Sequence, residues 1–237
     1  RLCAAGFPAF RFDYRGMGDA QGEFVGFERI DNDIRAAIDR FFEAVPEMTE
    51  VVLWGECDAS SAILFYAHRD VRVKGLVLLN PWVRTQAGEA KTILRFYYLQ
   101  RIMQPSFWKK VFGLRFNPFA SLWSAWKLMR MTRTPKPSSV QTAGQTLGAP
   151  ISREGSLPER LLQGLTRFAG PVMLVLSGRD LIAREFDEVV SADVAWQEQF
   201  RAKPVTRYDH PSADHTFSSA EERDQVVGWG LEWLRGW

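Results

Sequence analysis

Apolar runs and amphipathic stretches alternate along the first and last thirds of the chain. Apolar runs of strand length lie at 9–14, 51–54, 75–79, 171–176 and 204–208. Apolar residues at helical spacing predict one helix from Ile30 to Phe42 and a second helix through Ile63 and Ala67. Apolar strands separated by amphipathic helices indicate an α/β fold with a mostly parallel sheet and helices on both faces.

A closing helix is predicted after the last apolar run. It should begin at Ser218 or Ser219, because Glu221 and Glu222 then stand where capping-box partners are needed. The opening letters RLCAAGF resemble the last turns of a helix that ends at Gly6. We therefore expect that the sequence is truncated at its N-terminus.

The alternation stops between about Pro81 and Phe168, where the sequence first becomes aromatic and basic and then rich in Pro, Ser, Thr and Gly. This interval predicts an insertion in the α/β core. We expect the core at 1–83 and 166–237, and a basic, aromatic-rich helical cap at 84–165.

Composition excludes several classes of protein. The 237 residues are 46% hydrophobic, enough to bury a core and too apolar for wholesale disorder. Two Cys are too few for a disulfide framework, and the two Cys and three His lack the spacing of a zinc site. We therefore expect a reducing, cytoplasmic location. We also expect no metal and no cofactor. No apolar run reaches the roughly 18 to 20 residues of a membrane-spanning helix.

Charge divides the chain more sharply than its net value of +2 suggests. Residues 90–153 contain eleven basic and no acidic residues, which leaves nineteen basic and 28 acidic residues elsewhere, a charge of −9. Ten aromatic residues are interleaved with this basic stretch. It could form a cap whose aromatic side chains face the active site, or a surface in peripheral contact with anionic lipid at the inner membrane. Nucleic acid is disfavoured because no binding motif is present and the flanks are acidic.

Gly55-Glu56-Cys57-Asp58-Ala59 stands where a predicted strand turns into a predicted helix. This is the context of the G-x-S-x-G nucleophile elbow, which needs small residues at its first and fifth positions because the turn is crowded. The middle residue here is a thiol. The helix N-terminus favours its thiolate and the two acidic neighbours oppose it. Cys57 could also be a small apolar residue that begins a buried helix.

Two further residues follow predicted strands. Asp180 lies in Ser-Gly-Arg-Asp and His215 in Ala-Asp-His-Thr-Phe, which gives the order Cys57, Asp180, His215. This is the nucleophile, acid and histidine order of α/β hydrolases. His210 is a weaker candidate for the base because it precedes Pro211 in a predicted turn, and His68 is expected at the surface.

The loop Phe12-Asp13-Tyr14-Arg15-Gly16-Met17-Gly18-Asp19-Ala20-Gln21-Gly22 resembles the D-x-R-G-x-G-x-S loop of α/β hydrolases of the serine aminopeptidase and monoacylglycerol lipase type. With the elbow and the acid and histidine loops, the whole chain resembles the exosortase A system-associated hydrolase 1 family, which accompanies exopolysaccharide gene clusters. Cys57 replaces the Ser that is usual in the wider superfamily.

The resemblance implies an acyl-enzyme hydrolase of a carboxylic ester or thioester, with Cys57, Asp180 and His215 as the triad. It implies the Asp58 backbone N–H as one oxyanion donor. It also implies that the N-terminal strands of the fold and the loop that gives the second donor are missing from this sequence. The substrate would be a small or lipid-linked acyl compound. Asp13 and Arg15 are expected to tie their loop together through a salt bridge. An acyltransferase acting on a sugar or lipid carrier and a non-catalytic partner of polysaccharide machinery remain alternatives.

Overall fold

The computed structural model describes residues 1–83, 151 and 154–236. Within these residues one sheet contains four parallel strands that follow one another in chain order. They are β1 (Val51–Glu56), β2 (Val73–Leu79), β3 (Val172–Ser177) and β4 (Val205–His210). The α/β class and four of the five predicted strands are thereby confirmed.

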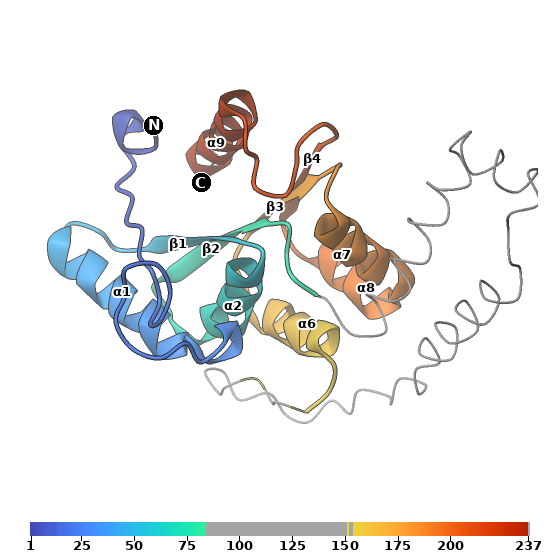
Figure 1. The fold of residues 1–237 in the computed structure, drawn as a ribbon, viewed down its shortest axis with the longest axis horizontal. Coiled ribbons are helices and arrows are strands. Elements are labelled where there is room, and N and C mark those ends of the chain that lie inside the picture. Colours follow the sequence, from blue (N-terminus) through green and yellow to red (C-terminus); the bar gives the residue numbers. More distant parts are fainter. Residues whose placement is uncertain (84–150, 152–153, 237) are drawn as a thin grey trace, which may run out of the picture. The chain divides into compact units, whose positions relative to one another are not determined.

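The helices connect these strands in a way that fixes which face each one covers. The described helices are α1 (Asp31–Ala44), α2 (Asp58–Tyr66), α6 (Leu157–Arg167), α7 (Leu181–Ala192), α8 (Val194–Ala202) and α9 (Ala220–Arg235), with 3₁₀ turns η1 (Cys3–Ala5), η2 (Phe27–Arg29) and η3 (Ala67–Arg69). Right-handed crossovers between strands taken in order place the described connecting helices on one face. Figure 1 shows α1, α2 and α6 on that face and α9 on the other.

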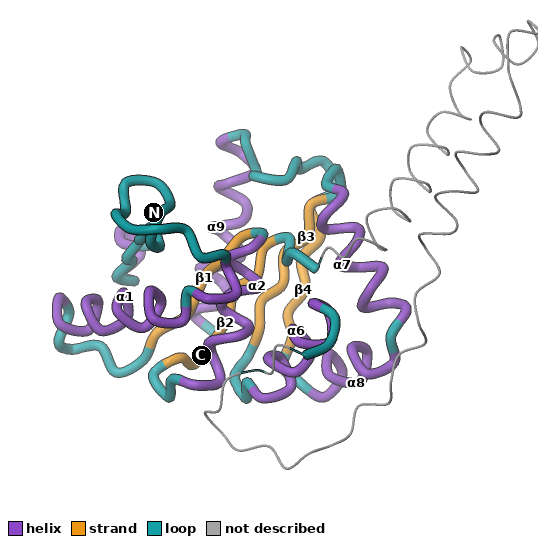
Figure 2. Tube along the Cα trace, turned by 60° about the horizontal axis from the view of Figure 1, so that its bottom comes forward, coloured by secondary structure: helices purple, strands orange, loops and turns teal. Residues whose placement is uncertain are grey.

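Two apolar clusters fill the two faces of the sheet. In the larger cluster, side chains of four helices pack against one face of the sheet, among them Ile34 of α1, Leu64 of α2, Leu161 of α6 and Trp196 of α8. The smaller one packs residues of α9 against the opposite side chains of β2 and β3, among them Val226 and Trp233. In the tube of Figure 2 the strands run side by side between these helices, so both faces are covered as predicted.

The closing helix starts where its capping signal predicts. Ser219 is the N-cap of α9: its side chain accepts a hydrogen bond from the backbone N–H of Glu222, and the Glu222 side chain accepts one from the N–H of Ser219. At the N-terminus, Gly6 ends η1 with φ 89°. Arg1 forms an ion pair with Asp224, which ties the start of the chain to α9.

The predicted strand at 9–14 is wrong. These residues take no part in the described sheet, and Phe10 and Phe12 are 47% and 38% exposed. The two rings stack on one another, with centroids 6.5 Å apart, and Phe10 also stacks on Phe41 of α1. A run of strand length forms a strand only where a neighbouring strand accepts and donates its backbone hydrogen bonds, and the described residues provide none here.

Most of the predicted cap lies outside the described residues. Its last part, 157–165, falls in α6 and packs with the core. A Cβ on Gly164 would stand 2.2 Å from the carbonyl oxygen of Leu64, so the missing side chain lets α6 approach α2 closely. None of the described helices is long and apolar enough to cross a membrane.

Candidate active site

The turn between β1 and α2 has the strained geometry of a nucleophile elbow. Cys57 has φ 56° and ψ −120°, a conformation that non-glycine residues rarely adopt. A Cβ at position 55 would lie 2.6 Å from backbone atoms of Ala59 and Ser60, which is why the first position must be glycine. The thiol therefore stands between the end of β1 and the first turn of α2.

Ser60 fixes this turn to the neighbouring strand. Its hydroxyl is fully buried and lies 2.6 Å from the carbonyl oxygen of Gly55 and 2.9 Å from that of Leu79, and it accepts a hydrogen bond from the Leu79 N–H. The Cys57 N–H also donates to the Leu79 carbonyl at 2.9 Å. The elbow is thus bonded to the end of β2 on both sides of the thiol.

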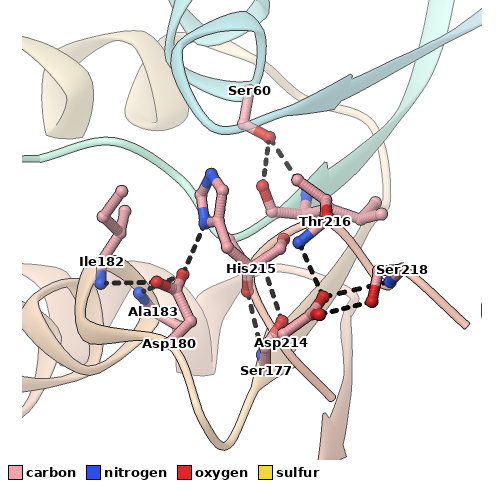
Figure 3. A network of polar contacts seen from close by, with 11 residues as sticks. Ser60, Ser177, Asp180, Ile182, Ala183, Asp214, His215, Thr216 and Ser218 are labelled. Carbon is pink, nitrogen blue, oxygen red and sulfur yellow. Dashed lines mark hydrogen bonds and ion pairs between the residues drawn. The ribbon is translucent and has the colours of Figure 1, made fainter. Parts of the chain in front are cut away.

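Asp180 and His215 meet at the same edge of the sheet, after β3 and β4. Nδ1 of His215 lies 2.8 Å from Oδ2 of Asp180, whose side chain is 7% exposed. Asp180 is also the N-cap of α7, where its two oxygens accept the N–H groups of Ile182 and Ala183 at 3.1 Å each. Figure 3 shows the carboxylate held between these amides and the imidazole ring. A carboxylate fixed in this way can orient the ring and stabilise its positive charge.

Asn80 is a site residue that the sequence analysis did not single out. It is fully buried at the end of β2 with φ 44°. Its Nδ2 donates to the Ser177 hydroxyl at 2.7 Å and to the His215 carbonyl at 2.8 Å, and its Oδ1 accepts the Ser177 N–H at 2.9 Å. Asn80 therefore holds the histidine loop against the end of β3. The only signal in the sequence was an Asn-Pro pair directly after a buried strand.

The thiol is protonated at neutral pH in this resting site. Burial raises the pKa of Cys57 to about 11, and the negative charges of Asp58, Asp180 and Glu56 contribute to the increase. A hydrogen bond from the Asp58 backbone N–H to the sulfur acts in the opposite direction. A thiol of this kind requires a base to remove its proton, in contrast to cysteines that are already ionised.

Glu56 introduces a second carboxyl group near the histidine. Burial raises its pKa, while the charge of His215 lowers it. Its Oε1 is buried, and the described part of the chain offers that atom no hydrogen-bond partner. The carboxyl group lies close enough to His215 for its charge to affect the site.

The remaining residues singled out from the sequence do not contact the Asp180–His215 pair. His210 ends β4, and its ring packs edge to face against Phe217 and Trp229, so it does not share the Asp180 carboxylate. Arg15 forms its salt bridge with Asp33 of α1 at 2.9 Å. Asp13 accepts the Asp19 N–H at 3.5 Å, which closes the loop.

The salt bridge expected of Asp13 and Arg15 is replaced by two separate contacts: Arg15 ties the loop to α1, and Asp13 closes the loop on itself. Among the described residues no group of three His, Cys, Asp or Glu side chains could hold a metal ion.

The family model described as serine aminopeptidase, S33, matches residues 1–140 of the chain. No curated protein matches its sequence. Among solved structures, the Pyrococcus furiosus esterase Pf2001 has a TM-score of 0.59 at 13% identity, with 100% of this chain and 72% of that chain covered.

Two other esterases have lower TM-scores. A carboxyl esterase from Bacillus coagulans has a TM-score of 0.51 at 12% identity, over 90% of this chain and 73% of that one. An esterase domain from Rhodothermus marinus has a TM-score of 0.50 at 17% identity, over 99% and 75%. At these identities the likeness is one of fold.

Proposed function

The chain belongs to the serine aminopeptidase S33 family of α/β hydrolases, and on this basis we propose that it hydrolyses a carboxylic ester or thioester with Cys57 as nucleophile. The observation that carries the proposal is a strained elbow that holds Cys57 after β1, together with a His215 that bonds the buried Asp180 after β3 and β4. Both stand at the carboxyl ends of the strands of one parallel sheet. Open α/β sheets bind their ligands at this edge. The esterase activity of the structural neighbours agrees with the proposal.

Acylation begins with proton transfer from the thiol. With Nδ1–H donated to Asp180, Nε2 of His215 is free to accept the Cys57 proton, and Asp180 stabilises the imidazolium that results. The thiolate then attacks the substrate carbonyl carbon, and the N–H of Asp58 stabilises the negative oxygen. When the intermediate collapses, the bond to the alcohol or thiol breaks and the leaving group takes the proton from His215.

Deacylation repeats these steps with water. His215 accepts a proton from a water molecule, the hydroxide attacks the thioester carbonyl, and the carbon–sulfur bond breaks to release a carboxylic acid. The imidazolium returns its proton to the Cys57 sulfur, which restores the starting site. Since the resting thiol has a pKa of about 11, the base is essential to each turnover at neutral pH.

The test is hydrolysis of a panel of p-nitrophenyl esters and acyl thioesters by variants of the triad. We expect Cys57→Ala and His215→Gln each to lower kcat/KM by at least about 1,000-fold. His210→Gln is the matched control, because this histidine lies nearby without contacting Asp180, and it should change kcat/KM by less than about threefold. Full activity in Cys57→Ala would exclude the thiol as nucleophile.

Product analysis decides between hydrolysis and acyl transfer. A thioester on Cys57 can also pass its acyl group to an alcohol, so the same assays should include sugar and lipid-carrier acceptors. A free carboxylic acid as the sole product supports the hydrolase. An acylated acceptor formed faster than the free acid would establish the acyltransferase instead.

An association with exosortase and exopolysaccharide systems is a further part of the proposal. It is supported by the resemblance of the Gly55–Ala59 elbow and the loops around it to the family found with those gene clusters. A strain that carries Cys57→Ala should lose exopolysaccharide to the same degree as a deletion strain. If the variant keeps wild-type exopolysaccharide while the deletion loses it, the protein acts there as a non-catalytic partner.

A further inference from the structure

Tyr14 reaches the nucleophile elbow from a loop 44 positions away in the sequence. Its hydroxyl donates a hydrogen bond to Oδ2 of Asp58 at 3.2 Å. The half-buried ring stacks on Phe24, with centroids 6.1 Å apart and planes inclined by 29°. The ring is thus held in place by packing as well as by the hydroxyl.

Asp58 acts on the thiol in two opposing ways. Its backbone N–H donates to the Cys57 sulfur and favours the thiolate, whereas its carboxylate places a negative charge beside the same sulfur and disfavours it. The backbone N–H is fixed by the start of α2. The carboxylate is held by a side chain from elsewhere in the chain, so its effect on the thiol depends on that partner.

We propose that Tyr14 is a positioning residue for the nucleophile, whose phenol holds the Asp58 carboxylate and limits the effect of its negative charge on the Cys57 thiol. A hydrogen bond donated to a carboxylate stabilises and disperses its charge. This inference rests on the proposed role of Cys57. It assigns a function in thiol activation to a loop residue that lies outside the triad.

The titration properties of the phenol agree with this role. The pKa of Tyr14 is raised to about 12, first by burial and then by the charge of Asp58 and their hydrogen bond, with a contribution from Cys57. The phenol therefore keeps its proton over the whole range in which a cysteine enzyme works, and it remains a donor. The contribution of Cys57 also shows that the phenol lies within electrostatic range of the sulfur.

The other carboxyl groups near the thiol interact with groups other than Tyr14. Asp180 is bound by His215 and by two backbone amides. Glu56 faces the charge of His215 and those of Asp180 and Asp214. Replacing the Tyr14 hydroxyl leaves these contacts unchanged, so a change in thiol reactivity in that variant comes through Asp58 or from the phenol itself. Removing the Asp58 carboxylate distinguishes the two.

The experiment measures the rate of Cys57 alkylation by iodoacetamide between pH 7 and 11. Mass spectrometry of the peptides separates Cys57 from Cys3, which is exposed. Tyr14→Phe keeps the stacked ring and removes the hydroxyl. We expect its Cys57 profile to move to higher pH by about half a unit to one unit, so that the rate at pH 8.5 falls about 3- to 10-fold.

A double-mutant cycle assigns the effect to the carboxylate. Asp58→Asn removes the opposing charge and should increase the rate at pH 8.5 by a similar factor. In the Asp58→Asn background, Tyr14→Phe should change the rate by less than about 1.5-fold, because residues that act through one interaction are not additive. Tyr66→Phe is the matched control. Its hydroxyl donates to Asp70 at 2.8 Å at the opposite end of the sheet, and its loss should leave the profile unchanged.

The inference is overturned if Tyr14→Phe leaves the alkylation profile unchanged, or if it slows alkylation equally with and without the Asp58 carboxylate. Alkylation needs no substrate turnover, so this result is separate from the hydrolase proposal. An unchanged profile together with Cys57-dependent hydrolysis would refute the role of Tyr14 alone. A shifted profile in a protein without Cys57-dependent hydrolysis would refute the proposed function alone.

Discussion

Replacing Asn80 by alanine removes the side chain that joins the end of β2 to the end of β3 and to the histidine loop. Three hydrogen bonds of 2.7 to 2.9 Å are lost at a fully buried position. Each contributes about 1 kcal/mol net, and the two partner groups in the buried Ser177 are left with little access to water. Alanine at φ 44° adds about 1 kcal/mol, because asparagine tolerates the left-handed region better. We expect a loss of about 3–5 kcal/mol.

Urea unfolding followed by circular dichroism measures this loss. The midpoint should fall while the slope m stays constant, since the surface exposed on unfolding is the same. Asn32→Ala, at an exposed position in α1, is the matched control and should change stability by less than about 0.5 kcal/mol. Under conditions where both proteins are folded, Asn80→Ala should lower kcat more than it changes KM, because the base is displaced.

A loss below about 1 kcal/mol would refute the reasoning. It would mean that the three buried hydrogen bonds are replaced by water or by neighbouring groups, and that the histidine loop does not depend on Asn80. Unchanged kcat in a destabilised variant would refute only the second part, the link between this side chain and the position of His215.

Three other predictions concern the elbow, the response to acid and the basic stretch. In urea unfolding, Gly55→Ala should lower the free energy of unfolding by more than about 3 kcal/mol, because its Cβ would lie 2.6 Å from backbone atoms. Gly228→Ala, whose Cβ would have no atom within 4 Å, should raise it by up to about 1 kcal/mol. Equal effects of the two substitutions would refute the packing argument. The hydrogen bond from Arg72 is the largest cause that lowers the pKa of Asp70, from 3.8 to about 2. Its stabilising effect is therefore complete above about pH 4 and is lost as the pH falls toward 2, so acid titration of unfolding should show a smaller loss for Asp70→Asn than for wild type. The protein should co-sediment with vesicles that contain anionic lipid, and salt should weaken this binding if the basic residues of 90–153 make the contact. Absent or salt-independent binding would refute a lipid-binding surface in this stretch.

The described strands and the closing helix could be predicted because their signals are local. Buried central strands consist of continuous apolar residues, as β2 and β3 do, and the Ser219–Glu222 box marks the start of a helix without reference to tertiary contacts. The run at 9–14 has the same local signal and forms no strand, because pairing depends on a neighbour that the local pattern does not describe. Composition assigned residues 157–165 to the cap. The structure packs them against α2 in the core, and this tertiary contact has no local signal in the sequence.

In the candidate site, too, features with a local sequence signal could be predicted and those that depend on tertiary contacts could not. The elbow pattern predicted the strained turn at Cys57, and the contact of Asp180 with His215 forms because the carboxyl ends of parallel strands meet at one edge. Asn80 and Tyr14 could not be found in this way. Their roles come from contacts across 97, 135 and 44 positions, for which a single sequence carries no periodic signal.

The most direct test of the account is intact-mass spectrometry of the protein after exposure to acyl esters and thioesters of several chain lengths, beside Cys57→Ala. In the wild type we expect a mass increase equal to one acyl group less the thiol hydrogen that it replaces. His215→Gln should form little or no adduct at neutral pH, because a thiol with a pKa of about 11 then has no base to remove its proton. The adduct should be absent from Cys57→Ala. An acyl adduct that forms equally in Cys57→Ala, or hydrolysis without any adduct on Cys57, would show that this thiol does not carry the acyl group.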